Sequence, residues 1–278
     1  MVDRTPRSMV GRAAGVVRGT AAMAGWRPRP RGASVLTYHD VTDDPAKPTE
    51  QVTPAALQAQ LTTALHWGLR FVPLPDLSER VLRGEPVDGL AAITFDDALV
   101  GVHRNAMGVL AELDLPATVF VVTDRLGTEE PVWYPGSDRV MTIDELREVA
   151  AAGVDVQSHT RTHADLPSIR GAALDEELAG SRAALGDLLG REVEYLAYPF
   201  GHYDSHVRTA ARDAGYRAAF TFRNGRVVPG LDPYRLPRLP MWTGASRFRL
   251  AYNLARPPWS FPESQVDSVT RGNTLERT

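Results

Sequence analysis

Residues 91–97 read Ala-Ala-Ile-Thr-Phe-Asp-Asp, an apolar run that ends in two neighbouring carboxylates. A short run of this composition predicts a buried strand. Carboxylates at the rim of a core are costly unless a cation lies beside them, so Asp96 and Asp97 indicate a metal site. The alternative is that they cap the helix that follows the strand and supply its first-turn acid.

Runs similar to 91–95 alternate with helical patterns along the chain, which is typical of βα units around a parallel sheet. Strands are predicted at residues 34–38, 70–73, 91–95, 117–122, 154–157, 193–198, 218–222 and 235–239. Helix signals lie between them, for example Thr53 before Pro54 and a capping box of Thr142 with Glu145. The predicted fold class is α/β, a single-domain, irregular (β/α)7-8 barrel over residues 33–255. We expect a partly disordered basic arm at 1–32 and a loose tail at 256–278.

The composition is that of a folded chain, with 43% hydrophobic and 23% charged residues among 278. Residues 1–31 carry seven arginines and one acid, whereas the whole chain has a net charge of −3, so the body is acidic. An acidic body argues against nucleic acid as a partner. The basic arm is either a solvated leader or a peripheral contact with an anionic membrane surface.

Other sequence features bear on the cellular location of the protein. Arg12 and Arg18 interrupt the only apolar stretch near the start, so no signal peptide is predicted. We therefore expect a cytoplasmic or membrane-peripheral protein. The absence of cysteine excludes disulfides and thiolate ligands. The oligomeric state is not predicted.

A second polar cluster, Ser-His-Thr-Arg-Thr-His at residues 158–163, follows the strand predicted at 154–157. The spacing of His159 and His163 lets both imidazoles face one ion. Two histidines and one carboxylate leave coordination sites open for water and substrate, as a catalytic metal site requires. A structural or surface role for the pair is the alternative. In a barrel, both clusters lie at the C-terminal ends of strands, where catalytic groups gather.

Three motifs in this order resemble the polysaccharide deacetylase family, also called the NodB homology domain or carbohydrate esterase family 4. Thr-Phe-Asp-Asp stands at 94–97, His-Thr-Arg-Thr-His at 159–163 and Ala-Tyr-Pro-Phe-Gly at 197–201. The resemblance covers about 200 residues, from Ser34 to roughly Met241. The opening Val-Leu-Thr-Tyr-His-Asp-Val at 35–41 is similar to that of the subgroup acting on poly-N-acetylglucosamine.

The resemblance implies a metal-dependent deacetylase of N-acetylated sugars. It assigns one divalent ion to Asp97, His159 and His163, and the role of general base to Asp96. Zinc is the first choice, although the ligand set also suits Co, Mn, Ni or Fe. The backbone N–H of Phe200 is implied as an oxyanion donor.

The sequence departs from the family pattern at two places. The motif arginine that holds the catalytic Asp in relatives is Ala197 here, and Arg161, Arg223 and Arg238 are the candidates to replace it. The usual general acid, a histidine in Leu-x-His near the C-terminus, is absent, and Arg238 stands at that position. We predict that His39 is the general acid, because it follows the first strand and titrates in the useful range. A substrate-contacting His39 is the alternative.

Substrate contacts are predicted for Tyr198, Pro199 and Gly201, and for Trp133 as a stacking surface for a sugar ring. Packing of its own loop is the alternative for Trp133. The expected partner is an N-acetylhexosamine in a polysaccharide, glycoconjugate or small glycoside. Two other functions stay open: a metal hydrolase of a non-sugar amide, and a non-catalytic sugar-binding relative.

Overall fold

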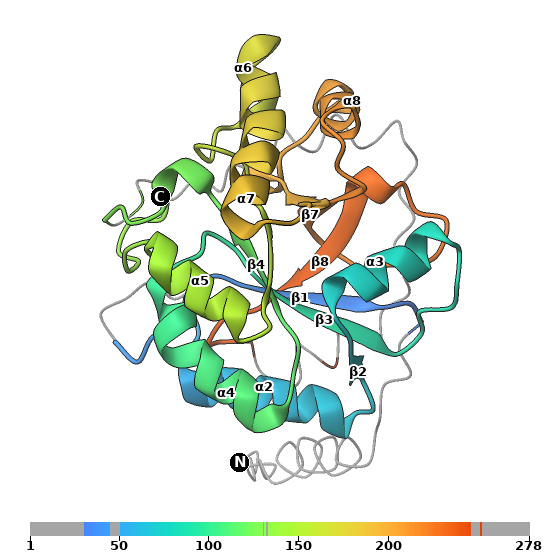
Figure 1. Cartoon of the computed structure of the whole chain (residues 1–278). Coiled ribbons are helices and arrows are strands. Elements are labelled where there is room, and N and C mark those ends of the chain that lie inside the picture. The colour runs from blue at the N-terminus through green and yellow to red at the C-terminus, as the bar shows by residue number, and fades with distance from the viewer. Residues whose placement is uncertain (1–30, 45–50, 130, 132, 246–250, 252–278) are drawn as a thin grey trace, which may run out of the picture.

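The computed structural model describes residues 31–44, 51–129, 131, 133–245 and 251. Within these residues a closed ring of seven parallel strands is surrounded by helices (Figure 1). The strands of the ring are β1 (Ser34–Tyr38), β3 (Leu90–Phe95), β4 (Thr118–Val121), β5 (Asp155–Ser158), β6 (Tyr195–Ala197), β7 (Ala218–Asn224) and β8 (Leu236–Pro240). The predicted irregular (β/α) barrel is therefore confirmed. The predicted arm and the tail at 256–278 lie almost wholly outside the described residues.

The ring closes between β1 and β3, which pair in parallel from Ser34 with Ala91 to Tyr38 with Phe95. The second predicted strand does not take a place in the ring. Only Arg70–Phe71 forms a strand, β2, and it pairs with the start of β3. This displacement makes the barrel irregular and brings the C-terminal ends of β1 and β3 together.

Helices follow most strands and cover the outside of the ring. They are α2 (Pro54–His66), α3 (Leu74–Leu82), α4 (Met107–Leu113), α5 (Ile143–Ala151), α6 (Ala172–Asp175), α7 (Ser181–Leu189) and α8 (Ser205–Asp213). Two π-helical turns, η1 (Val102–Ala106) and η4 (Glu176–Gly180), precede α4 and α7. Short 3-10 turns are η2 (Thr123–Arg125), η3 (Leu166–Ser168), η5 (Pro199–Gly201) and η6 (Pro233–Arg235). No helix in the described ranges is long and apolar enough to cross a membrane.

The predicted helix caps are present. Thr53 accepts a hydrogen bond from the N–H of Ala56 at 3.1 Å, at the start of α2. Thr142 and Glu145 form the capping box of α5, with reciprocal bonds of 3.2 and 2.8 Å. Such caps satisfy N–H groups that have no partner inside the helix. The local signals in the sequence therefore predict where these helices begin.

Strand alternation decides which side chains reach the inside of the barrel. On β3, Ile93 and Phe95 pack in the large cluster that includes helix residues. Ala92 belongs to a second cluster that also holds Phe120 and Phe220. Because Asp96 shares the parity of Ala92, its carboxylate turns toward the inside of the ring, at the C-terminal end of the strand.

Candidate metal centre

Asp96 and Asp97 lie at the end of β3 and are each only 2% exposed. The N–H of Asp96 continues the strand ladder by donating to the carbonyl of Tyr38 at 2.9 Å. The chain then turns, since Asp97 has φ 68° and Ala98 has φ 51°. This left-handed turn is uncommon outside glycine, and it points the two carboxylates to different partners. In the described part of the chain these partners are side chains, so the helix-cap interpretation is not supported.

The two histidines follow β5, where the N–H of His159 still donates to the carbonyl of Val121 at 2.8 Å. The Nδ1 of His159 lies 2.8 Å from the carbonyl oxygen of Ala197. A carbonyl only accepts, so Nδ1 carries the proton and the lone pair of Nε2 is left to face the site. This arrangement prepares His159 as a ligand.

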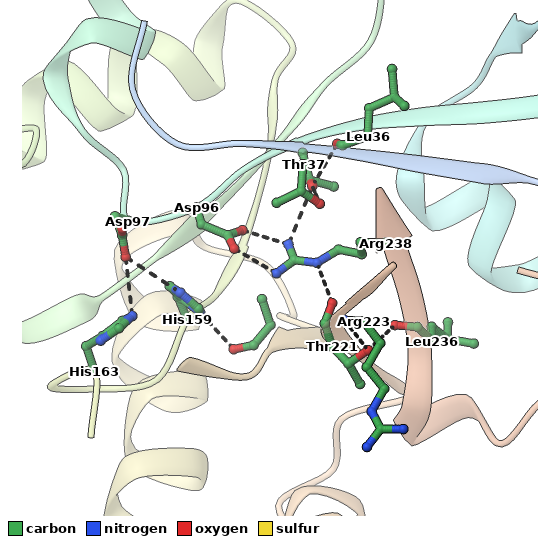
Figure 2. A network of polar contacts seen from close by, with 12 residues as sticks. Leu36, Thr37, Asp96, Asp97, His159, His163, Thr221, Arg223, Leu236 and Arg238 are labelled. Atoms are coloured by element: carbon green, nitrogen blue, oxygen red, sulfur yellow. Dashed lines mark hydrogen bonds and ion pairs between the residues drawn. The ribbon is translucent and has the colours of Figure 1, made fainter. Parts of the chain in front are cut away.

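Asp97, His159 and His163 meet in one buried group, in which one potential ligand atom from each lies within 4.8 Å of the others (Figure 2). Oδ1 of Asp97 is 3.6 Å from Nε2 of His159 and 3.5 Å from Nε2 of His163. Within the described residues this is the one group of this kind. The structure therefore brings together the three ligands that the motifs predict.

The charges of this group fit a cation. Burial lowers the pKa of both imidazoles, that of His163 to about 2, so both are neutral and can offer a lone pair to a cation. Burial and the charge of Asp96 raise the pKa of Asp97 to about 8. The carboxylate therefore lacks a compensating charge, which a divalent ion would supply. Nδ1 of His163 is a buried polar atom with no hydrogen-bond partner among the described residues.

Asp96 is held by Arg238 from β8, through bonds of 2.7 Å from Nη1 to Oδ1 and from Nη2 to Oδ2 (Figure 2). The Nε of Arg238 donates to the carbonyl of Thr221 at 3.0 Å, and the arginine is fully buried. Burial alone would raise the pKa of Asp96, but the charge and hydrogen bonds of Arg238 outweigh it and lower the pKa to about 2. Asp96 is thus kept as a carboxylate beside the metal group.

Of the three candidate arginines, Arg238 is the one that contacts Asp96. Arg161 pairs with Asp124 and Glu176, and Arg223 lies over the ring of Tyr203 at 5.9 Å. Arg238 therefore replaces the motif arginine that is missing at Ala197. The signal was present in the sequence as a charged residue inside an apolar strand, a costly placement unless the charge is paired.

His39 lies at the mouth of the barrel, directly after β1. Its ring centre is 5.4 Å from that of Tyr134 and 5.7 Å from that of Phe222. It is near enough for its charge to contribute to lowering the pKa values of Asp96 and His163. This placement is compatible with the predicted general acid, and that role stays a prediction.

The third motif forms η5, in which Phe200 has φ 57° and Gly201 has φ 69°. The Phe200 ring meets His163 edge to face at 4.6 Å and is 47% exposed. No acceptor among the described residues receives the N–H of Phe200. A Cβ at Gly201 would come within 2.4 Å of the backbone of Phe222, so this turn requires glycine.

Two residues that were predicted to contact the substrate, Tyr198 and Pro199, are buried. Tyr198 is fully buried, its ring stacks on Tyr203 at 5.3 Å and its hydroxyl donates to the carbonyl of Tyr234 at 3.1 Å. It is a core residue, because its side chain points outward from the ring into the helix layer. Pro199 is buried as well, and with Gly201 it shapes the turn around Phe200.

Trp133 lies against the metal ligands. Its ring stacks on His163 at 4.3 Å with planes 12° apart, and its Nε1–H donates to Oδ1 of Asp97 at 3.1 Å. The guanidinium of Arg125 also lies over the ring, at 5.8 Å. The face that touches His163 is closed to a sugar, and the ring contacts two of the three predicted ligands, Asp97 and His163.

The barrel holds a buried Asp-His-His group and, beside it, a carboxylate that is bound by an arginine. This combination defines a class of proteins that can bind a metal ion and transfer protons next to it. The family model of polysaccharide deacetylases matches residues 83–219, which include all three motifs. Over these residues, about half of the chain, the sequence matches the polysaccharide deacetylase family.

Individual relatives are distant. The chain is 25% identical over 162 residues to YxkH of Bacillus subtilis, covering 58% of this chain and 55% of that protein. It is 24% identical over 200 residues to the poly-beta-1,6-N-acetyl-D-glucosamine N-deacetylase of Staphylococcus epidermidis, covering 68% of this chain and 67% of that protein. The matched region thus spans between about half and two thirds of the length of these relatives. The structure of IcaB from Ammonifex degensii superposes with a TM-score of 0.70 at 25% identity, covering 83% of this chain and all of that chain.

Proposed function

We propose that this protein is a metal-dependent N-deacetylase that hydrolyses the acetamide of an N-acetylhexosamine in a sugar polymer or glycoconjugate. The observation that carries the proposal is that a possible metal site and an ionised carboxylate lie side by side at the mouth of the barrel. Asp97, His159 and His163 can hold a cation, and Asp96 is kept ionised beside them by Arg238. The family and the name of the staphylococcal relative support the acetamide of a sugar as the bond that is cleaved.

Each residue has a chemical task in this reaction. A bound divalent ion would acidify a water molecule and polarise the acetamide carbonyl. Asp96 accepts the proton of the attacking water, since its pKa of about 2 keeps it unprotonated at neutral pH. The N–H of Phe200 donates to the oxyanion that forms. His39 donates a proton to the departing amine. We propose zinc as the ion, because two histidines and one carboxylate are a common catalytic zinc set.

The proposal is tested by measuring bound metal and then acetate release from N-acetylglucosamine oligomers, with an N-acetylated peptide as the non-sugar control. We expect release from the sugar only, loss of release after chelation and recovery with zinc. Asp96→Asn should retain the metal and lose turnover by more than about 100-fold, the usual lower range for a general base. Metal binding without acetate release from any sugar would contradict the proposal, and release from the peptide alone would indicate an amidase.

His39 is tested separately. His39→Ala should bind zinc with wild-type affinity, because none of the three ligands is changed, and should lose turnover. His39→Gln keeps a polar side chain of similar length but cannot transfer a proton, so it should be equally inactive. If either variant turns over at the wild-type rate, His39 is not the acid.

A further inference from the structure

The segment that carries both histidine ligands has an unfavourable backbone. Thr160 has φ 70° and His163 has φ 65°, and neither is glycine. Each such residue is strained and persists only when the surroundings impose its conformation. Something outside the segment must therefore hold residues 159–163 in the shape that presents both imidazoles.

Glu177 is in direct contact with this segment. It is 7% exposed and projects from the π-helical turn η4. Its Oε2 accepts the backbone N–H groups of Arg161 at 3.0 Å and Thr162 at 2.9 Å. Its Oε1 accepts the hydroxyl of Thr162. One buried carboxylate thus satisfies three donors in the middle of the ligand segment.

The same helical unit also contacts the start of the segment. Oγ of Ser158 accepts the N–H of Thr160 at 3.2 Å and lies 3.0 Å from Oγ of Ser181, the first residue of α7. Ser181 in turn bonds the carbonyl of Glu177 at 2.6 Å. The segment is therefore held at two points by η4 and α7. A π-helical turn inside a helix often occurs at a functional site, because it displaces the side chains around it.

We propose that Glu177 is a positioning residue that holds the loop of His159 and His163 in its metal-binding conformation before the ion arrives. The inference rests on the proposed metal-dependent function and adds a residue that no motif of the family resemblance contains. Glu177 does not bind the ion. It lowers the ordering cost of binding, because a preformed site requires no rearrangement of the strained backbone.

The neighbouring Glu176 provides a matched control. Its carboxylate pairs with the guanidinium of Arg161 on the exposed surface and touches no backbone N–H of the ligand segment. Glu177→Gln and Glu176→Gln each remove one negative charge from adjacent positions. In Glu177→Gln the amide oxygen can still accept from the backbone N–H groups, but these hydrogen bonds lose their charge assistance, and an NH2 donor replaces the oxygen that accepts from the Thr162 hydroxyl.

The experiment measures the affinity of the metal-free full chain for Co²⁺ and Zn²⁺ by competition with a chromophoric chelator, and records the visible Co²⁺ spectrum. We expect Glu177→Gln to bind 10–100-fold more weakly, the usual range for residues that orient ligands. Glu176→Gln should stay within about twofold. Far-UV circular dichroism of both variants should match wild type.

Thr162→Val is the second variant, in case Glu177→Gln does not fold. It removes only the hydroxyl that bonds Oε1 and leaves both N–H bonds in place, so we expect a smaller loss of affinity and an unchanged spectrum.

Wild-type affinity and spectrum in Glu177→Gln would overturn the inference and leave the proposed function intact. Equal losses in Glu176→Gln and Glu177→Gln would overturn it too, since charge alone would explain them. A wild-type chain that binds neither ion would overturn both.

Discussion

At the scale of single residues, the pair of Asp96 and Arg238 shows how a buried carboxylate is kept ionised. Both side chains are at most 3% exposed, and two parallel hydrogen bonds of 2.7 Å join them. The planar guanidinium matches a carboxylate at two points, which a lysine cannot do. Asp96 can therefore stay ionised in a buried position, where it faces the metal group.

Removal of this arginine should change both stability and pH dependence. Arg238→Ala leaves a buried carboxylate without its partner, and we expect it to lower the free energy of unfolding by about 3–5 kcal/mol. Burial is then opposed only by the charges of His159 and His39, so the pKa of Asp96 rises from about 2. Because the base works only when unprotonated, the acidic limb of the kcat/KM profile should move to higher pH.

Arg238→Lys is the milder variant for the kinetic profile, since it retains the charge and loses the second hydrogen bond. Urea unfolding gives the stability and acetate release gives the profile. An acidic limb that stays in place in both variants would show that Arg238 does not tune Asp96.

Trp133 has two interpretations that kinetics can separate. The geometry predicts that Trp133→Phe, which loses the hydrogen bond to Asp97 but keeps an aromatic ring on His163, weakens metal binding about 10-fold. A sugar-stacking role predicts instead a higher KM with unchanged metal affinity. Chelator competition and saturation kinetics on the same variant distinguish the two outcomes.

At the scale of elements, the loops after the strands build the site, and their turns need left-handed residues. Asp97, Thr160, His163 and Phe200 all have positive φ although none is glycine. Three of them are predicted metal ligands or the oxyanion donor. The barrel and the helices that pack on it impose this backbone strain, which is typical of functional sites.

Gly201 is the turn residue at which we expect substitution to be tolerated least. Gly201→Ala should destabilise the fold by about 1–2 kcal/mol for the positive φ and by a further 1–3 kcal/mol for the clash with Phe222. Gly230→Ala is the matched control, because Gly230 has φ +86° and nothing within 4 Å of a new Cβ. It should show the first cost only. Equal losses of unfolding free energy in the two variants would contradict the close approach at Gly201.

At the scale of the whole molecule, metal binding and folding are linked. The three ligands come from loops after β3 and β5, so the group exists only in the folded chain. An ion that binds only the folded state stabilises it by about 2.7 kcal/mol at a concentration 100 times its dissociation constant. We expect zinc to raise the Tm in scanning calorimetry. Asp97→Asn should abolish most of this shift, and an undiminished shift would mean that the ion binds elsewhere.

Much of the fold could be predicted because its signals are local. Thr53 and the capping box at Thr142 mark helix starts, and most predicted strands agree with the observed ones to within a few residues. The second strand was the exception, since only Arg70 and Phe71 form it, outside the ring. Its position depends on the pairing of β1 with β3, which no short window of sequence encodes.

The sequence by itself determined the alternation of strands and helices, and it determined the motifs that name Asp96, Asp97, His159 and His163. These features depend on neighbours a few positions apart, so periodicity and spacing reveal them. The tertiary structure alone decided that Arg238 is the partner of Asp96, a contact between residues 142 positions apart. It also decided that Tyr198 belongs to the core, that Trp133 contacts Asp97, and that Glu177 contacts the segment of His159 and His163. The physical reason is that such contacts depend on strand register and on side-chain direction in the closed ring, which only the assembled barrel defines.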